Sequence, residues 1–250
     1  MSELKLYAFT CGMFQSKKSF FVATDGDEMV KSPIPAYLIE HPKGRALFDT
    51  GLNLRFRREA DAQLRADEMG FDIDESAEIA ARLRAMDVDP GSIDWIINSH
   101  LHADHCGGNA YIPNATMVIQ SKELATARAC EIPMLYDRKD YDHGHPILAI
   151  DGEHDLFGDG SVIIFPTLGH TVGHQSVRVR LPKGDVVLAG DCCYLKRNLD
   201  ELVVPDLNVD REVSIETLRK LRQMRDNGTR IFYGHDRDFW KTVPQATAIA

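Results

Sequence analysis

The chain has 250 residues, of which 44% are hydrophobic and 27% charged, and its formal net charge is −9. There is enough apolar material for a sizeable core, and an acidic chain without a Lys/Arg block excludes a nucleic-acid-binding surface. No apolar run is long enough to span a bilayer, and nothing at the N-terminus has the pattern of a secretion signal. The five cysteines lack framework spacing and no linker divides the chain, so we expect a cytoplasmic protein with one domain over residues 1–250.

The N-terminal part of the chain predicts strands followed by a helix. Strands are expected over residues 5–9, 35–40 and 45–49. The Pro and Gly of residues 41–44 suit a hairpin turn between the last two strands. Apolar residues at helical spacing predict a helix over 77–86. The densest basic run, Arg55–Arg58, is followed by acidic residues and predicts a solvated helix face.

The rest of the chain mixes strands and helices. A strand over 93–98 is followed by one over 116–120, which leads into a helix capped near Ser121 with Glu123 in its acidic first turn. Residues 129–151 are expected to be irregular. The remaining elements are strands over 161–166, 175–181, 185–189 and 230–233 and a helix over 213–225. This order predicts a layered α/β protein whose sheet is not all parallel.

The most informative feature is the run His100-Leu101-His102-Ala103-Asp104-His105, which follows an apolar strand. While the backbone stays extended, a spacing of two places the rings of His100 and His102 on one side. The glycines that follow allow a tight turn, which can direct Asp104 and His105 towards a second metal. Imidazole and carboxylate suit zinc and similar divalent ions, so the run predicts a metal site rather than a solvated turn.

Four more polar residues stand at the ends of predicted strands. They are Asp49, His170, Asp191 and His235. Each residue alone would be read as part of a turn, but loops at one edge of a sheet are where a rigid scaffold presents functional side chains. The sequence therefore predicts that these residues meet the histidine-rich run at one edge of the fold.

With these residues the chain resembles the metallo-β-lactamase superfamily, whose H-x-H-x-D-H motif stands here as the run from His100 to His105. The resemblance implies an αββα sandwich, in which two mixed sheets pack face to face between layers of helices. Within the superfamily, Asp191-Cys192-Cys193-Tyr194, Gly169–Ser176 and Gly234-His235-Asp236 resemble the N-acyl-homoserine lactone lactonases, which are quorum-quenching enzymes. Ala103 departs from the family, which often has an aromatic residue there, and this leaves the shape of the pocket open.

The resemblance also implies a set of ligands for two Zn²⁺ ions or other divalent metals. His100, His102 and His170 would bind the first ion, Asp104, His105 and His235 the second, and Asp191 would bridge both. Two such metals make a bridging hydroxide available by lowering the pKa of bound water to about 7. In this scheme Asp104 is the acid for the leaving alkoxide, and Tyr194 donates to the developing oxyanion unless it is a half-buried core tyrosine. Asp49 would orient a ligand imidazole.

The remaining candidate residues receive structural interpretations. His174 is expected to be structural or to orient a ligand, because the seven ligand positions are already filled. Cys106 and Cys192 are expected to be buried thiols, since adjacent side chains point away from each other. Asp236 is expected to pair with a nearby base. Solvated side chains are expected at His143, His145 and His154.

The leading functional hypothesis is a metal-dependent lactone hydrolase that opens the ring of N-acyl-homoserine lactones. The alternative is a lactonase or esterase for another small lactone, such as a pyridoxolactone. An acyl chain needs an apolar groove, whereas a compact polar ring needs polar or basic groups around it. Candidates for an apolar groove are Met13, Phe14, Phe20, Phe21 and the segment 129–151.

Two further hypotheses are a non-catalytic metal-binding scaffold and a thiol-ester hydrolase. Gaps in the ligand set would favour the scaffold, and activity on acyl-glutathione would identify the thiol-ester hydrolase. No ligand position is missing from the sequence. The expected partner is therefore a small-molecule lactone, with no nucleic acid and no membrane, and the chain is expected to be a monomer or a homodimer.

Overall fold

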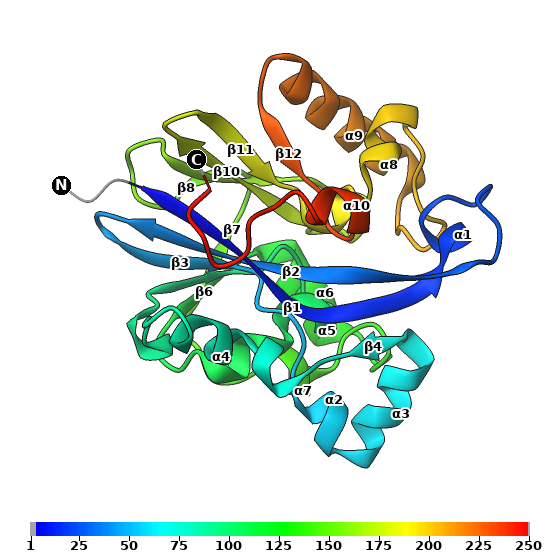
Figure 1. Cartoon of the computed structure of the whole chain (residues 1–250), viewed down its shortest axis with the longest axis horizontal. Coiled ribbons are helices and arrows are strands. Elements are labelled where there is room, and N and C mark those ends of the chain that lie inside the picture. Colours follow the sequence, from blue (N-terminus) through cyan, green and yellow to red (C-terminus); the bar gives the residue numbers. More distant parts are fainter. Residues whose placement is uncertain (1–3, 250) are drawn as a thin grey trace.

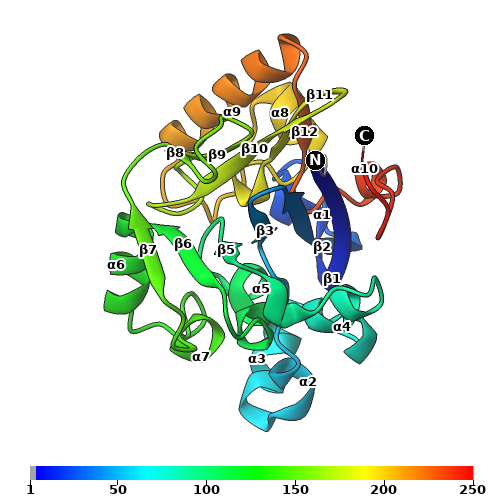
Figure 2. The ribbon, with the colours of Figure 1, turned by 90° about the vertical axis from the view of Figure 1, so that its left-hand side faces the viewer.

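Two mixed β-sheets pack face to face, and helices cover their outer faces (Figure 1, Figure 2). The computed structural model describes residues 4–249. In Figure 1, α8 and α9 lie above the two sheets and α4 lies below them. The αββα sandwich expected from the sequence is therefore confirmed.

The first sheet has seven strands in the order β4-β1-β2-β3-β5-β6-β7. Its strands are β1 (Lys5–Lys17), β2 (Met29–His41), β3 (Gly44–Phe48), β4 (Phe71–Asp72), β5 (Trp95–Ile97), β6 (Thr116–Gln120) and β7 (Ile147–Ile150). Strands β1, β2 and β3 pair antiparallel, and β3, β5, β6 and β7 pair parallel. The parallel strands end at the same edge, where loops that follow them can converge.

The second sheet has five strands in the order β12-β11-β10-β9-β8. Its strands are β8 (His154–Asp155), β9 (Val162–Pro166), β10 (Gln175–Leu181), β11 (Gly184–Leu188) and β12 (Arg230–Phe232). All neighbours pair antiparallel except β11 and β12, which pair parallel. The carboxyl ends of β11 and β12 therefore lie side by side.

The helices are short apart from α9. They are α1 (Lys18–Phe21), α2 (Arg55–Arg58), α3 (Ala60–Met69), α4 (Ile79–Arg84), α5 (Ala103–Cys106), α6 (Ser121–Ala129), α7 (Arg138–Tyr141), α8 (Lys196–Glu201), α9 (Arg211–Asp226) and α10 (Arg237–Trp240). Short 3₁₀ turns occur at Glu75–Ala77, Pro90–Ser92, Gly107–Tyr111 and Gly190–Cys192. Within residues 4–249, no helix is long and apolar enough to cross a membrane.

The main core lies between the two sheets. Alternate residues of β1, such as Leu6 and Ala8, pack in one buried cluster with alternate residues of β10, such as Val177 and Val179. This is the period of two expected when one face of a strand is buried. On the outer face of the second sheet, Leu218 and other apolar residues of α9 pack on the sheet. The amphipathic pattern of the helix therefore explains its position.

The sequence prediction placed the strands well but made the first two too short. The strands expected over 116–120 and 175–181 are β6 and β10, and the hairpin joins β2 to β3 as predicted. Strands β1 and β2 have 13 residues each. The extra length follows a β-bulge between Thr10 and Met13, where Gly12 adopts a φ of 126°. The bulge allows β1 to continue past the core and carry Phe14 to the site described below.

Three expectations for the middle of the chain were wrong. The segment 129–151 contains α7 and the edge strand β7, which pairs with β6. Helix α6 is not capped by Ser121, because its N-cap position is Gln120 and the Ser121 hydroxyl donates to the Ile150 carbonyl instead. Within the run Arg55–Arg58, Arg57 and Arg58 are exposed as expected, but Arg55 does not lie on a solvated face. It is buried and donates to Asp140 at 2.8 Å.

Candidate metal centre and active-site cavity

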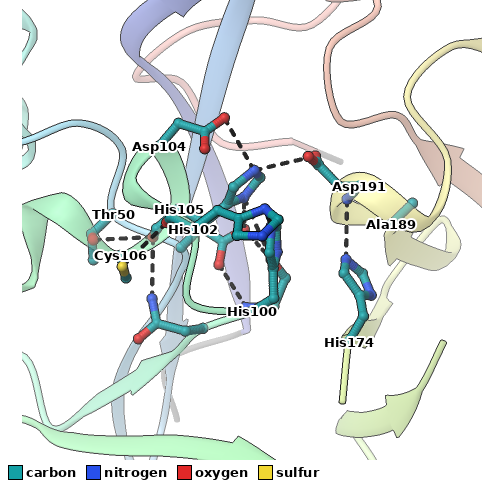
Figure 3. Close-up of polar contacts among 12 residues, drawn as sticks. Thr50, His100, His102, Asp104, His105, Cys106, His174, Ala189 and Asp191 are labelled. Atoms are coloured by element: carbon teal, nitrogen blue, oxygen red, sulfur yellow. Dashed lines mark hydrogen bonds and ion pairs between the residues drawn. The ribbon is translucent and has the colours of Figure 1, made fainter. Parts of the chain in front are cut away.

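The polar residues from the strand ends meet in two groups at one edge of the sandwich. Within each group, one donor atom of every residue lies within 4.8 Å of the others. The first group is His100, His102 and His170, and the second is Asp104, His105, Asp191 and His235. These are the seven residues predicted from the sequence, and Figure 3 shows five of them together with His174.

The fold explains why residues so far apart in the sequence converge. The histidine-rich run follows β5 and enters α5, which carries Asp104 and His105. His170 follows β9, Asp191 lies in the 3₁₀ turn after β11, and His235 follows β12. Because β11 and β12 are parallel neighbours, they deliver their polar residues to the same edge.

In the first group, three imidazole nitrogens face one another. His100 Nε2 lies 2.9 Å from His102 Nδ1, and His170 Nε2 lies 3.1 Å from both of these atoms. This spacing is short enough for a single ion to contact all three nitrogens at ~2.0–2.1 Å, the usual Zn–N distance.

Hydrogen bonds on the far side of the rings fix which nitrogen carries the proton in this group. The Ser99 hydroxyl donates to Asp49, so it must accept from His100 Nδ1 at 2.9 Å. The Asn208 amide donates through its Nδ2 to Ser214, which leaves its oxygen to accept from His170 Nδ1 at 3.3 Å. The Nε2 atoms of His100 and His170 therefore present lone pairs to the shared point between the rings.

In the second group, imidazole nitrogens face carboxylate oxygens. Asp191 Oδ1 lies 3.2 Å from His105 Nε2 and 3.1 Å from His235 Nε2, and Asp104 Oδ2 lies 3.4 Å from His105 Nε2. The other ring nitrogens donate outward. His105 Nδ1 donates to Asp49 at 2.8 Å, and His235 Nδ1 donates to the Pro33 carbonyl at 2.8 Å.

Burial lowers the pKa of the histidines in both groups, but in the second group the neighbouring carboxylates raise it. Burial, together with the neighbouring His170, lowers the pKa of His102 to about 3, and the pKa of His100 also falls well below its usual value. Burial also disfavours a charge on His105, but the carboxylates of Asp191 and Asp104 outweigh it and raise the pKa of His105 well above its usual value. The first group therefore offers neutral nitrogen donors, and the second offers a pocket that favours positive charge.

These donor sets fit divalent metal ions. His105 Nε2 and Asp191 Oδ1 are buried and have no hydrogen-bond partner among residues 4–249. Imidazole nitrogens and carboxylate oxygens that converge in a buried site without hydrogen-bond partners are satisfied when a cation lies between them. Nitrogen and carboxylate oxygen are the donors that zinc and similar ions use. The arrangement is that of a binuclear metal site.

Two more residues that were not predicted as ligands hold the groups in place. Asp49 adopts a φ of 54° and accepts hydrogen bonds from the Ser99 backbone and hydroxyl as well as from His105. His174 lies outside both groups, as predicted, and its Nε2 accepts from the Asp191 backbone N–H at 3.1 Å. Figure 3 shows this contact between His174 and Asp191.

Other sequence expectations had mixed outcomes. No base of residues 4–249 pairs with Asp236. Its carboxylate instead caps α10 through the N–H groups of Asp238 and Phe239 and accepts from the backbone N–H of Lys196. Cys106 and Cys192 are buried thiols outside both groups, and burial raises the pKa of Cys192 to about 12. His143 is exposed, as expected, whereas His145 and His154 are half-buried. His143 donates through Nε2 to the Asp140 carbonyl and His145 donates through Nε2 to the Ile112 carbonyl.

A cavity of about 400 Å³ opens onto both groups of donors. Its polar floor is formed by His102, Asp104, His170, Asp191, Tyr194 and His235. Its apolar wall is formed by Phe14, Phe20, Met29, Met69, Phe71, Met134, Leu135 and Leu207. Of the groove residues expected from the sequence, Phe14 and Phe20 line the cavity, but Met13 and Phe21 do not. Ala103 also lies outside the lining and packs in a neighbouring apolar cluster.

Tyr194 is buried but lines this cavity, so it is not merely a core tyrosine. Its hydroxyl lies 3.2 Å from His170 Nδ1, and its ring stacks on His235 with the centroids 5.5 Å apart. Burial and the charges of Asp191 and Asp104 raise the pKa of the phenol well above its usual value. Since His170 Nδ1 carries a proton, the hydroxyl oxygen can accept from it and keep its own hydrogen free to donate into the cavity.

Besides Ser99, which accepts from His100, sequence reasoning missed two residues that hold the site in place. Asn208 orients His170, and the buried carboxylate of Glu123 accepts hydrogen bonds from loops beside the histidines. Asn208 carried no sequence signal because it lies in an irregular segment. Glu123 was assigned to the first turn of a helix, and the length of its side chain was the only sign that it could reach another element.

Comparisons with known proteins agree with this geometry. The model of the metallo-beta-lactamase superfamily matches residues 30–235. The N-acyl homoserine lactonase AttM of Azorhizobium caulinodans is 29% identical over 98% of both chains, and the N-acyl homoserine lactonase of Bacillus cereus is 28% identical over 94% of both. A solved structure of an N-acyl homoserine lactone hydrolase with N-hexanoyl-L-homoserine bound at its metal centre is 26% identical and has a TM-score of 0.88, with all of both chains covered.

Proposed function

The chain belongs to the metallo-beta-lactamase superfamily, and from this premise we propose that it opens the lactone ring of N-acyl-homoserine lactones. The superfamily and the donor groups support a metal-dependent hydrolase. The relatives named above act on N-acyl-homoserine lactones or hold their products, which supports the choice of substrate.

The observation that carries the proposal is the composition of the cavity. Its floor holds residues of both donor groups and Tyr194, and most of its wall is built from phenylalanine, methionine and leucine side chains, with Gln15, Ser16, Lys17 and Glu68 completing the lining. The one cation in the lining, Lys17, is paired with Asp27 at 2.9 Å. A lactone head with an apolar tail matches this division, since the tail removes the wall from water. A compact polar ring such as a pyridoxolactone would leave the apolar wall without a partner.

The two groups would hold one metal each. His100, His102 and His170 would bind one ion, Asp104, His105 and His235 the other, and Asp191 would lie between them. When bound, two divalent ions supply Lewis acidity to an ester carbonyl and a nucleophile derived from water at neutral pH.

Side chains of the cavity floor would perform the remaining steps. The Tyr194 O–H donates a hydrogen bond to the carbonyl oxygen as negative charge develops on it. Asp104 accepts the proton released by the attacking water and returns it to the ring oxygen as the C–O bond breaks, so that the product is a hydroxy acid. The buried position of Asp104, with 8% exposure, keeps this proton transfer away from bulk water.

We expect the purified protein to bind two divalent metals per chain and to lose stability when they are removed. Without metal, buried lone pairs and carboxylates face one another unsatisfied, and a ligand that binds only the native state stabilises it. Elemental analysis and thermal denaturation before and after chelation measure both effects. A protein that holds at most one tight metal after growth with added zinc would argue against the binuclear centre.

We also expect kcat/KM to rise with the length of the acyl chain until the apolar wall is covered. Burying one methylene is worth ~0.8 kcal/mol, so the increase should be up to about fourfold for each carbon added. A series of N-acyl-homoserine lactones from butanoyl to dodecanoyl, assayed with the zinc-loaded enzyme, measures this trend. A flat series would show that the wall does not bind the acyl chain.

A further inference from the structure

Glu123 is a buried carboxylate that the mechanism above does not use. Its side chain has an exposure of 0%, and no Lys, Arg or His of residues 4–249 forms an ion pair with it. Burying a carboxylate away from a cation is costly unless hydrogen bonds satisfy its oxygens. Hydrogen-bond donors from the surrounding chain must therefore satisfy the two oxygens of Glu123.

Four donors surround the two oxygens of Glu123. Oε1 accepts from the Leu101 backbone N–H at 3.2 Å and from the Tyr136 hydroxyl at 3.0 Å. Oε2 accepts from the Thr171 hydroxyl at 2.7 Å and from the Gly173 backbone N–H at 3.2 Å. The carboxylate therefore joins three separate segments of the chain to the first turn of α6.

Each of these segments carries or touches a residue of the three-histidine group. Leu101 stands between His100 and His102, and Thr171 directly follows His170. The Tyr136 ring packs against the His102 ring, with the centroids 5.2 Å apart. None of the four donors is a sequence neighbour of Asp104, His105, Asp191 or His235. The contacts of Glu123 are therefore directed to one of the two donor groups.

The close packing at Gly173 shows that this contact is built into the fold. A Cβ atom at position 173 would lie 2.4 Å from the backbone nitrogen of Glu123 and 2.6 Å from its Cβ. A larger residue would push the loop after His170 away from α6 and break the hydrogen bonds to Oε2. The glycine thus permits the approach on which the network depends.

We propose that Glu123 is a positioning residue that holds the three-histidine group in its coordinating geometry and thereby sets the affinity for one metal of the pair. The inference rests on the metal centre of the proposed function. Fixed imidazole positions favour binding because the ligands need not be ordered when the ion enters. Loss of the anchor would loosen the first group and leave the second unchanged.

The test is a metal titration of the metal-free Glu123→Gln variant with Co²⁺ and with Zn²⁺. In glutamine an NH₂ group replaces one carboxylate oxygen and faces the two donors that this oxygen accepted from. One of these donors is a backbone N–H, which cannot accept, so its hydrogen bond is lost. Wild type is expected to bind two equivalents tightly. The variant should retain one tight equivalent and bind the other ~10-fold to 100-fold more weakly, the range typical of residues that orient metal ligands.

Reference variants identify which equivalent weakens. The Co²⁺ absorption bands lost in Glu123→Gln should match those lost in His102→Ala and differ from those lost in His235→Ala. Glu78→Gln is the matched control. Glu78 is also a buried carboxylate that accepts backbone N–H groups, from Ala80 and Ala81, but at the start of α4. The Glu78→Gln variant should bind both metal equivalents like wild type.

Smaller changes keep the proposal testable if Glu123→Gln does not fold. Tyr136→Phe and Thr171→Val each remove one hydroxyl donor, and each should weaken the same equivalent to a smaller extent. Unchanged binding of both metals in these variants, or equal weakening of both, would overturn the proposal. Wild type that binds fewer than two equivalents would remove the proposed metal centre itself, and this inference with it.

Discussion

Replacing Asp191 by asparagine is expected to abolish metal binding and hydrolysis together. Asp191 Oδ1 lies 3.2 Å from His105 Nε2 and 3.1 Å from His235 Nε2, and its Oδ2 lies 3.7 Å from His170 Nε2. It is thus the only side chain of residues 4–249 whose carboxylate contacts histidines of both groups. An amide is neutral and coordinates through one oxygen only, so metal affinity should fall by more than the ~10–100-fold typical of residues that merely orient a ligand.

The measurement is the metal content of the purified Asp191→Asn variant together with its hydrolysis rate. Asp236→Asn is the matched control, because Asp236 adjoins His235 but caps α10 and lies outside both groups. Asparagine is as good an N-cap as aspartate, so this control should fold, bind metal and remain active. An Asp191→Asn enzyme with two tight metals would show that Asp191 does not bridge the groups.

Removing the hydroxyl of Tyr194 is expected to lower kcat by ~10²–10³ while metal content and stability stay unchanged. The phenol lines the cavity beside Asp191 and lies 3.2 Å from His170. Its raised pKa keeps the hydrogen in place at neutral pH, so it can be donated to the oxyanion. Phenylalanine keeps the ring that stacks on His235 and loses only this donor.

Steady-state kinetics of Tyr194→Phe, with metal analysis and the melting temperature, separate the two roles. Tyr141→Phe provides the comparison, since the buried Tyr141 hydroxyl has no hydrogen-bond partner in the part of the chain that the structure describes and lies outside the cavity lining. That variant should leave kcat unaffected. If Tyr194→Phe also keeps the wild-type kcat, Tyr194 has a structural role and the oxyanion donor is another group.

The positions of the predicted ligands followed from local sequence because each ligand, or the histidine-rich run that contains it, follows an apolar strand. His170, Asp191 and His235 each stand just beyond a strand whose hydrophobic pattern is strong. Strand ends at one edge of a sheet converge whatever the details of the loops. This is why the meeting of these residues could be predicted without the structure, whereas their division into two groups of ligands was implied by the resemblance to the metallo-β-lactamase superfamily.

Among the residues that orient the ligands, Asp49 was predicted because it too ends a strand, and it accepts from His105. Ser99, Asn208 and Glu123 could not be found in this way. The contact between Glu123 and Thr171 spans 48 positions, and that between Arg55 and Asp140 spans 85. Such contacts depend on how helices and loops pack on the sheets, and neither hydrophobic period nor turn chemistry encodes that packing. Arg55 is an example. A charged run on a helix predicts exposure to solvent, but Arg55 is buried because it pairs with Asp140, a buried carboxylate on another element.

The edge of the first sheet shows the same limit. Strand β7 has four residues, and two of them are exposed, whereas the neighbouring strand β6 is buried over most of its length. Its pairing with β6 is a tertiary event, so residues 129–151 carried no strand signal. This segment nevertheless contributes Met134 and Leu135 to the cavity wall, as expected for the apolar groove. The lining was predicted only in part because other wall residues, Met29, Met69, Phe71 and Leu207, come from elements that carried no such signal.

The central claim is that a binuclear metal centre beneath an apolar wall opens the ring of N-acyl-homoserine lactones. The direct test is proton release by the zinc-loaded enzyme with a panel of substrates. The panel contains N-acyl-homoserine lactones, a pyridine-type lactone, a β-lactam and acyl-glutathione. We expect kcat/KM for the N-acyl-homoserine lactones to exceed that for the other three by a wide margin. Faster opening of the pyridine-type lactone than of any N-acyl-homoserine lactone would contradict the claim.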